Sequence, residues 1–78
     1  MLVFEGTITF EPDGSAVIWA SAPGGKRFKV RITRRYAEQT WRIRYSEDEV
    51  RTKIWLHIDD LRERVAREWV NGKAELVL

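Results

Sequence analysis

The sequence predicts a single α+β domain spanning residues 1–78: a three-stranded antiparallel meander, a short helix, a long amphipathic helix packed on one sheet face, and a short C-terminal strand. Two patterns lead to this prediction. Alternating apolar and polar residues between Gly-containing turns fill residues 2–33. An apolar stripe at helical spacing then fills residues 46–70. The chain is 44% hydrophobic and 33% charged, which is typical of a folded domain of this length.

The first two predicted strands flank a turn. Residues 2–10 are rich in Val, Ile, Thr and Phe and alternate with period two, and we expect Gly6 to form a bulge. Pro, Asp and Gly at residues 12–14 predict a turn, because Pro presets one dihedral angle and Gly accepts a positive one. Residues 15–21 are apolar on both faces, so we predict a central strand there.

Residues 26–33 give the clearest strand pattern in the chain. They follow a second turn with two glycines, at residues 23–25. Three apolar side chains alternate with three basic ones, which predicts one face on the core and one in water. The apolar residues are Phe28, Val30 and Ile32, and the basic residues, which we call the basic ridge, are Arg27, Lys29 and Arg31.

A short helix is predicted to follow the meander. We expect Thr33 to cap it over residues 34–39, because the Thr hydroxyl can accept a hydrogen bond from a first-turn N–H group. The next segment, Trp41 to Tyr45, fits a strand as well as an irregular connection, since three apolar residues alternate with two arginines. We favour a short connection.

The long helix is predicted to begin at a capping box made by Ser46 and Glu49. We expect it to run to Val70, where Asn and Gly at residues 71–72 would end it. Its apolar residues recur at spacings of three and four and form one stripe. The stripe consists of Val50, Ile54, Ile58, Leu61, Val65 and Trp69.

This helix is too long for the sheet. At about 1.5 Å per residue it would measure about 36 Å, whereas strands of seven or eight residues span about 25 Å. The helix must bury its stripe on the apolar sheet face, so it overhangs the sheet, crosses it diagonally or kinks. Residues 74–78 are predicted to close the chain as a short strand.

The order of these segments resembles a known family. The segments are SAVIWASAPGG at 15–25, KRFKVRI at 26–32, TRRYAE at 33–38, IDDLRERVA at 58–66, NG at 71–72 and AELVL at 74–78. From about residue 8 to the last residue, the chain resembles the small bacterial family named domain of unknown function 1488. The resemblance implies a small α+β fold in a bacterial cytoplasm. It implies no activity and no catalytic residues.

Composition excludes several kinds of chemistry. The chain has no cysteine, which excludes disulfides and thiolate catalysis and is typical of a reducing, cytoplasmic location. One histidine excludes a two-histidine metal site within the chain. His57 has no convergent second group, and Asp59 and Asp60 point about 100° apart on a helix. We therefore expect no enzyme, no catalytic or metal site, no cofactor and no membrane span.

Basic side chains concentrate in the middle of the chain. Residues 26–53 hold ten basic and four acidic side chains, although the net charge of the chain is only +2. Such a patch can neutralise phosphates, with Trp41 and Tyr45 as stacking surfaces for bases. The alternative is a solvated face whose charges pair with nearby acids, and with so small a net charge nucleic acid is a possible but not favoured partner. The candidate nucleic-acid-binding residues are Arg27, Lys29, Arg31, Arg34, Arg35, Arg42 and Arg44.

Trp55 and Leu56 lie away from the apolar stripe on a helical wheel. The interpretation we favour is that the short helix covers them, together with Tyr36 and Trp41, because large apolar side chains are usually buried. The alternative is a partner surface, since an exposed Trp–Leu pair is a typical anchor for self-association and would make the chain a homo-oligomer. The sequence thus favours a small non-enzymatic binding or self-associating domain.

Overall fold

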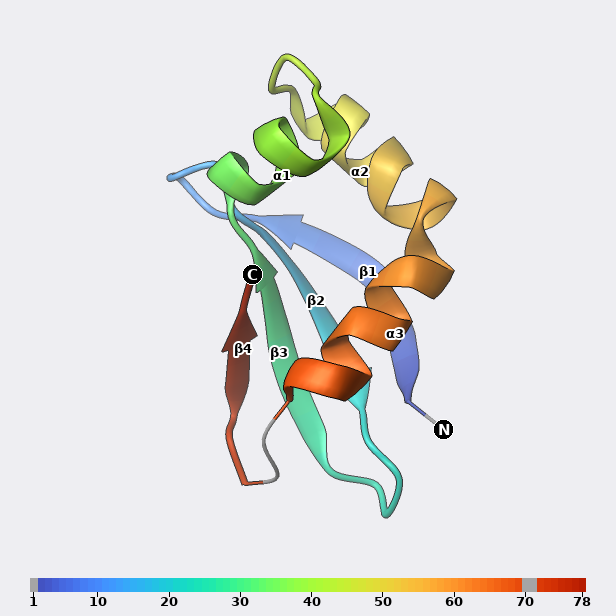
Figure 1. The fold of residues 1–78 in the computed structure, drawn as a ribbon. Coiled ribbons are helices and arrows are strands. Elements are labelled where there is room, and N and C mark those ends of the chain that lie inside the picture. The colour runs from blue at the N-terminus through green and yellow to red at the C-terminus, as the bar shows by residue number, and fades with distance from the viewer. Residues whose placement is uncertain (1, 70–71) are drawn as a thin grey trace.

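The α+β layout predicted from the sequence is confirmed. The computed structural model describes residues 2–69 and 72–78, and Figure 1 shows a sheet with helices packed on one side. The elements are β1 (Val3–Phe10), β2 (Ala16–Ser21), β3 (Arg27–Ile32), α1 (Arg34–Trp41), α2 (Glu47–Leu56), α3 (Ile58–Glu68) and β4 (Glu75–Val77).

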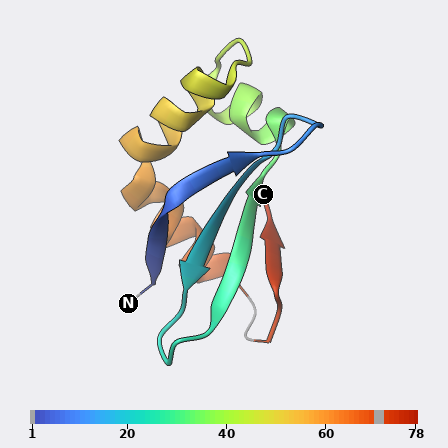
Figure 2. The same cartoon turned by 180° about the vertical axis from the view of Figure 1, so that it is seen from behind.

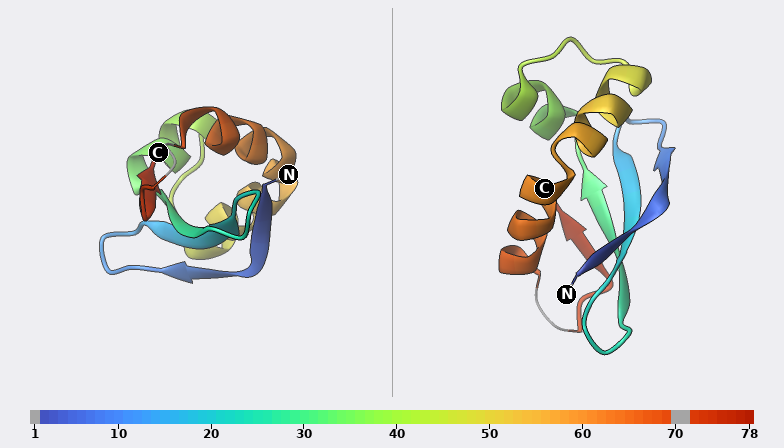
Figure 3. Two further views of the ribbon diagram at one scale, coloured as in Figure 1. Left: turned by 90° about the horizontal axis from the view of Figure 1, so that it is seen from below. Right: turned by 90° about the vertical axis from the view of Figure 1, so that its right-hand side faces the viewer.

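The four strands form one sheet in the order β1-β2-β3-β4. The first three strands are antiparallel neighbours, as the meander predicts, and β2 is central. The last strand, β4, pairs with β3 in parallel, because the chain returns along the helical layer before it reaches β4. All three helices cover the same face of the sheet (Figure 3, left). Within residues 2–69 and 72–78, no helix has the length and apolar character needed to cross a bilayer.

The bulge expected at Gly6 is present in β1. Phe4 lies opposite Ala20 and Ile8 lies opposite Ile18, so three residues of β1 match one residue of β2. β1 therefore has two more residues than β2 across the bulge. Because side chains alternate with a period of two, an insertion of two residues leaves the side chains before and after the bulge on the same faces of the sheet as in a regular strand. The strand bends at the bulge, as Figure 2 shows from the uncovered side.

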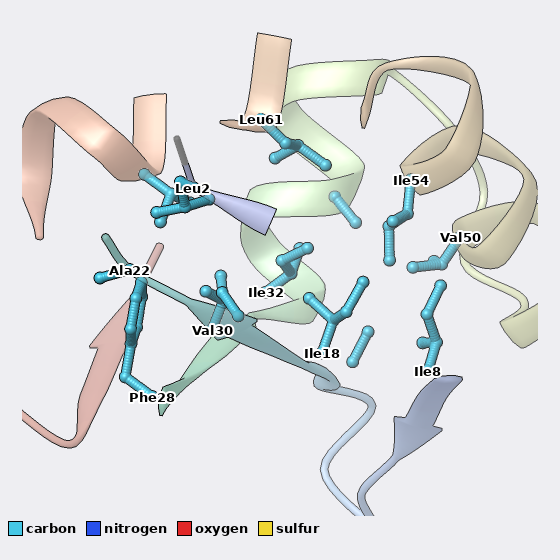
Figure 4. Close-up of a cluster of buried hydrophobic side chains, with 14 residues drawn as sticks. Leu2, Ile8, Ile18, Ala22, Phe28, Val30, Ile32, Val50, Ile54 and Leu61 are labelled. Carbon is cyan, nitrogen blue, oxygen red and sulfur yellow. The ribbon is translucent and has the colours of Figure 1, made fainter. Parts of the chain in front are cut away.

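The core lies between the sheet and the helices. Phe28, Val30 and Ile32 point into it from β3 and are almost fully buried, as their alternation predicts. Ile54, which is labelled in Figure 4, and Val65 contribute to the same core from the helical layer. The apolar stripe of the helices therefore packs on the predicted sheet face.

The predicted helix caps are confirmed. Thr33 Oγ1 accepts a hydrogen bond from the Tyr36 N–H at 3.1 Å, and Ser46 Oγ accepts one from the Glu49 N–H at 3.1 Å. The helix α1 continues two residues beyond the predicted end. It stops at Arg42, whose φ of 52° is left-handed. An irregular connection then leads to α2, as we favoured over a strand.

The prediction of one continuous helix from residue 47 to Val70 is wrong, because the chain kinks at His57 and forms two helices. The His57 N–H bonds to the Lys53 carbonyl and closes α2, while the His57 carbonyl accepts from the Leu61 N–H and opens α3. The kink resolves the mismatch in length, because it allows helix residues before and after the break to be buried on a short sheet. The chain is extended at Trp69. The expected stop at Val70 and Asn71 lies outside the described residues.

Candidate binding surfaces

The basic ridge lies on the outer face of the sheet, opposite the helices, and its first two members surround Trp19. The Arg27 guanidinium lies 4.1 Å from the centre of the Trp19 ring, and Lys29 Nζ lies 5.8 Å from it. Arg27 also donates two hydrogen bonds to Glu5, at 2.5 and 2.9 Å. These bonds lower the pKa of Glu5, because they stabilise its charged form.

Arg31, the third member of the ridge, lies between two carboxylates. Its Nε donates to Glu75 at 2.5 Å, and its Nη1 forms an ion pair with Glu11. The hydrogen bond from Arg31 holds the pKa of Glu75 below its usual value, and the positive charge of Lys29 acts in the same direction. Three acidic side chains thus accompany the three basic ones on this face.

The remaining candidate basic residues are separated from the ridge. Arg34 and Arg35 lie on α1, and Arg42 and Arg44 lie on the connection after it, all in the helical layer. Arg34 covers the Tyr45 ring at 4.6 Å and contacts Glu38 at 3.4 Å. The structure therefore divides the seven candidate residues between two sides of the molecule instead of one continuous surface.

The connection between α1 and α2 forms a groove of about 450 Å³, which we call the connection groove. Three cationic side chains line it: Arg42, Arg44 and Lys53. None of the three forms an ion pair with any other residue that the structure describes. The other lining residues are Trp41, Ile43, Tyr45, Ser46 and Glu49.

A second groove, of about 430 Å³, lies between α1 and α3, and aromatic contacts dominate it. The Trp41 indole stacks on the His57 imidazole with ring centres 5.9 Å apart, and it forms a T-shaped pair with the Tyr36 ring at 5.8 Å between centres. The Arg64 guanidinium covers Tyr36 at 5.3 Å. Trp41 and Tyr45, expected as stacking surfaces for bases, therefore both contact side chains of the chain itself.

The same groove offers little catalytic chemistry. His57 Nδ1 lies 3.9 Å from an Asp60 carboxylate oxygen, too far for a hydrogen bond. Among the described residues that line this groove there is no serine, and Thr40 carries the only aliphatic hydroxyl. In the part of the chain that the structure describes, no three His, Asp or Glu side chains come together as metal ligands.

Trp55 and Leu56 are exposed on α2. Trp55 keeps 39% of its surface in solvent and Leu56 keeps 67%, so the favoured interpretation that α1 covers them is wrong. The helix α1 packs instead on the flank of α2 and α3 that bears His57, where Trp41 stacks. His57 is two residues from Trp55, which is about 200° around a helix, so α1 cannot cover both residues.

Two ion pairs flank the exposed tryptophan along the helices. Arg51 contacts Asp48 at 3.3 Å, and Arg62 contacts Asp59 at 2.6 Å. The five residues Asp48, Arg51, Trp55, Asp59 and Arg62 recur at spacings of three, four, four and three. We call this set the Trp55 stripe. Its spacing is present in the sequence, but it appears only when acidic residues are considered together with the apolar and basic ones.

Known proteins offer no comparison for these surfaces, because no family model, no curated protein and no solved structure matches the chain.

Proposed function

We propose that this chain is a small non-enzymatic domain that self-associates, with Trp55 and Leu56 as its contact residues. The observation behind the proposal is that these two neighbouring large apolar side chains are exposed on one helix. Removal of exposed apolar side chains from water by a partner favours association by about 25 cal/mol per Å² of apolar surface buried. Tryptophan is also enriched among the residues that contribute most to protein interfaces.

A second copy is the occupant that charge favours. Trp55 lies between an acid–base pair on its N-terminal side and another on its C-terminal side, so these two pairs hold equal numbers of positive and negative charges. A strongly acidic or basic partner would find half of these charges repulsive, whereas an identical surface offers both signs. Charge balance therefore supports a homo-oligomer.

The remaining parts of the proposal rest on composition and local chemistry. A non-enzymatic role is supported by His57, whose ring stacks on Trp41 and has no hydrogen-bonded carboxylate to orient it. A cytoplasmic location is supported by the absence of cysteine. The resemblance to domain of unknown function 1488 stays a prediction and is compatible with this proposal, since it assigns no reaction.

Light scattering coupled to size-exclusion chromatography tests the proposal. We expect the unmodified chain to be a dimer at micromolar concentration and Trp55→Ala to be a monomer. Val77→Ala is the matched control, because Val77 is a similarly exposed apolar residue, on β4, and its loss should leave the dimer intact. An unmodified chain that is still a monomer at several hundred micromolar would refute the proposal.

The connection groove supports a second candidate function, the binding of single-stranded nucleic acid. The favouring observation is that Arg42, Arg44 and Lys53 line one groove and have no acidic partner among the described residues. The basic ridge, in contrast, is accompanied by Glu5, Glu11 and Glu75. Phosphates are therefore better accommodated at the groove than at the ridge, because ridge arginines would first have to leave their carboxylates.

Fluorescence anisotropy with a labelled oligonucleotide at low salt tests this second candidate. Arg42→Glu with Arg44→Glu should abolish binding, while Arg27→Glu with Arg31→Glu should reduce it little. The opposite result would return the site to the ridge of the sheet. No binding by the unmodified chain would exclude both surfaces.

A further inference from the structure

We propose that a second copy docks on the Trp55 stripe in an antiparallel, two-fold arrangement, with Arg51 of each copy facing Asp59 of the partner subunit. The inference depends on the proposed self-association and adds its geometry. It predicts which residues meet across the interface, so it can fail while self-association itself holds.

The members of the stripe share one face of the helical layer. The kink at His57 turns the helix axis, but the buried face continues across it, since Ile54 before the break and Leu61 after it are both buried and lie seven residues apart. With that phase kept, at about 100° per residue, Arg51 and Asp59 lie about 40° to either side of Trp55. On the same count, Asp48 and Arg62 lie about 20° to either side. Arg51, Trp55 and Asp59 are spaced by four residues and form one ridge of the i±4 type. Ridges of this type interdigitate in the commonest class of helix packing.

The order of charges along the stripe determines the direction of pairing. From the N-terminal end it reads acid, base, tryptophan, acid, base. Two copies laid in parallel would place like charges opposite each other. Two antiparallel copies centred on Trp55 place Arg51 opposite Asp59 and Asp48 opposite Arg62, so that every charge meets its opposite. The stripe is therefore complementary to itself in the antiparallel direction only.

A two-fold axis follows from this complementarity. In a two-fold interface the same patch serves on both subunits, so if one residue contacts a second, the second contacts the first. Arg51 and Asp59 then meet twice, once on each side of the axis, and Trp55 lies next to Trp55 of the partner subunit. Closed dimers form in this way, and longer assemblies do not.

The kink at His57 decides which of these contacts is closest. In Figure 1, α2 and α3 meet at an angle with the sheet on the inner side, so the helical layer is convex where the two helices join, directly after Leu56 in the sequence. At about 1.5 Å per residue, followed along α2 and through the kink into α3, Arg51 and Asp59 are each about 6 Å from Trp55, and Asp48 and Arg62 are each about 10 Å from it. We therefore expect the inner pair to contribute more than the outer pair.

The ion pairs within each copy leave the charges available. The side chains of Asp48 and Asp59 are 99% and 90% exposed. Each carboxylate has lone pairs for a second donor, and exposed pairs within a helix contribute only about 0.2–0.5 kcal/mol. Asp59 can therefore accept a second arginine without losing Arg62. Arg51 of each copy, whose guanidinium lies 5.1 Å from the centre of the Phe10 ring, turns from that ring to reach Asp59 of the partner subunit.

Charge reversal at the inner pair tests the geometry. Arg51→Asp and Asp59→Arg should each weaken the dimer at least about tenfold, because each places two like-charge contacts across the axis. Mixing the two variants in equal amounts should restore association as a heterodimer, since both contacts are then attractive. The chain with both substitutions should again form a homodimer. Sedimentation velocity measures all four samples, and circular dichroism confirms that each variant is folded.

The outcomes separate the geometry from the self-association. If the unmodified chain is a dimer but neither mixing nor the double variant restores it, the antiparallel pairing is wrong while self-association stands, for instance through the open edge of β1. If the unmodified chain is a monomer, both proposals fail. A salt titration of the unmodified dimer gives a second measure, and a dissociation constant that does not rise with salt overturns the charge pairing.

Discussion

The hydroxyl group of Thr33 donates a hydrogen bond to the backbone carbonyl of Leu78 at 3.0 Å, although 45 residues separate the two in sequence. The same oxygen accepts from the Tyr36 N–H and caps α1. One side chain thus joins the start of the helical layer to the segment after β4.

This double role makes Thr33→Ala more costly than removal of an ordinary cap. We expect Thr33→Ala to lower the free energy of unfolding by about 1–3 kcal/mol, since it removes a cap and leaves a carbonyl without its donor. Ser46→Ala removes an exposed cap only and should cost about 0.5–1 kcal/mol. Urea unfolding of both variants measures the difference. Equal costs would show that the bond to Leu78 contributes nothing.

A side chain at Gly14 is expected to cost more stability than one at Gly24. Its φ is +88°, and a Cβ there would lie 3.3 Å from both Arg34 Cδ and Tyr45 Cζ. Gly24 has a similar φ of +91° with open space around it, so Gly24→Ala has only the backbone cost of about 1–2 kcal/mol for a left-handed residue with a Cβ. Thermal unfolding should place Gly14→Ala clearly below Gly24→Ala in Tm. The reverse order would contradict this account of the turn.

Acid should weaken the outer face of the sheet. Because Arg31 lowers the pKa of Glu75 below its ordinary value of 4.5, the contribution of this pair is complete above pH 4.5 and is lost as the pH falls through the folded-state pKa. The free energy of unfolding should therefore fall less between about pH 7 and about pH 3 in Glu75→Gln than in the unmodified chain. Glu47→Gln, at an exposed position on α2, is the control, and an identical acid response in both variants would reject the prediction.

Ile54 and Leu56, two positions apart on α2, should differ greatly in how much stability the protein loses when each is replaced by alanine. Ile54 is fully buried, so Ile54→Ala should cost about 2–5 kcal/mol of unfolding free energy through lost burial and the cavity it leaves. Leu56→Ala should change the stability of the monomer by about 0.5 kcal/mol or less, because Leu56 lies in solvent. Urea unfolding at low protein concentration compares them. A large cost for Leu56→Ala in the monomer would mean that it packs within the chain.

Local patterns predicted the strands and both caps correctly, because alternation and the Thr33 cap depend on residues within a few positions of one another. The acidic partners of the basic ridge were not predictable in the same way. Glu5 is 22 residues from Arg27, and Glu75 is 44 residues from Arg31, so only the strand order brings them together.

Two features of the helical layer also depend on tertiary packing. Neither Gly nor Pro marks the kink at His57, which follows from the length of the sheet beneath it. The exposure of Trp55 depends on which flank of α2 is covered by α1, and a helical wheel treats both flanks alike. The Trp55 stripe can be found from its spacing in the sequence, but its exposure to solvent could not be predicted from that spacing.

The bulge in β1 constrains how this strand can change in length. Removal of two residues between Phe4 and Ile8 would straighten the strand and leave Phe4 directed at the core. Removal of a single residue would turn Phe4 into water and push Glu5 inward, away from Arg27. Insertions and deletions in this edge strand are therefore tolerable in even steps, and an odd step reverses the first part of the strand.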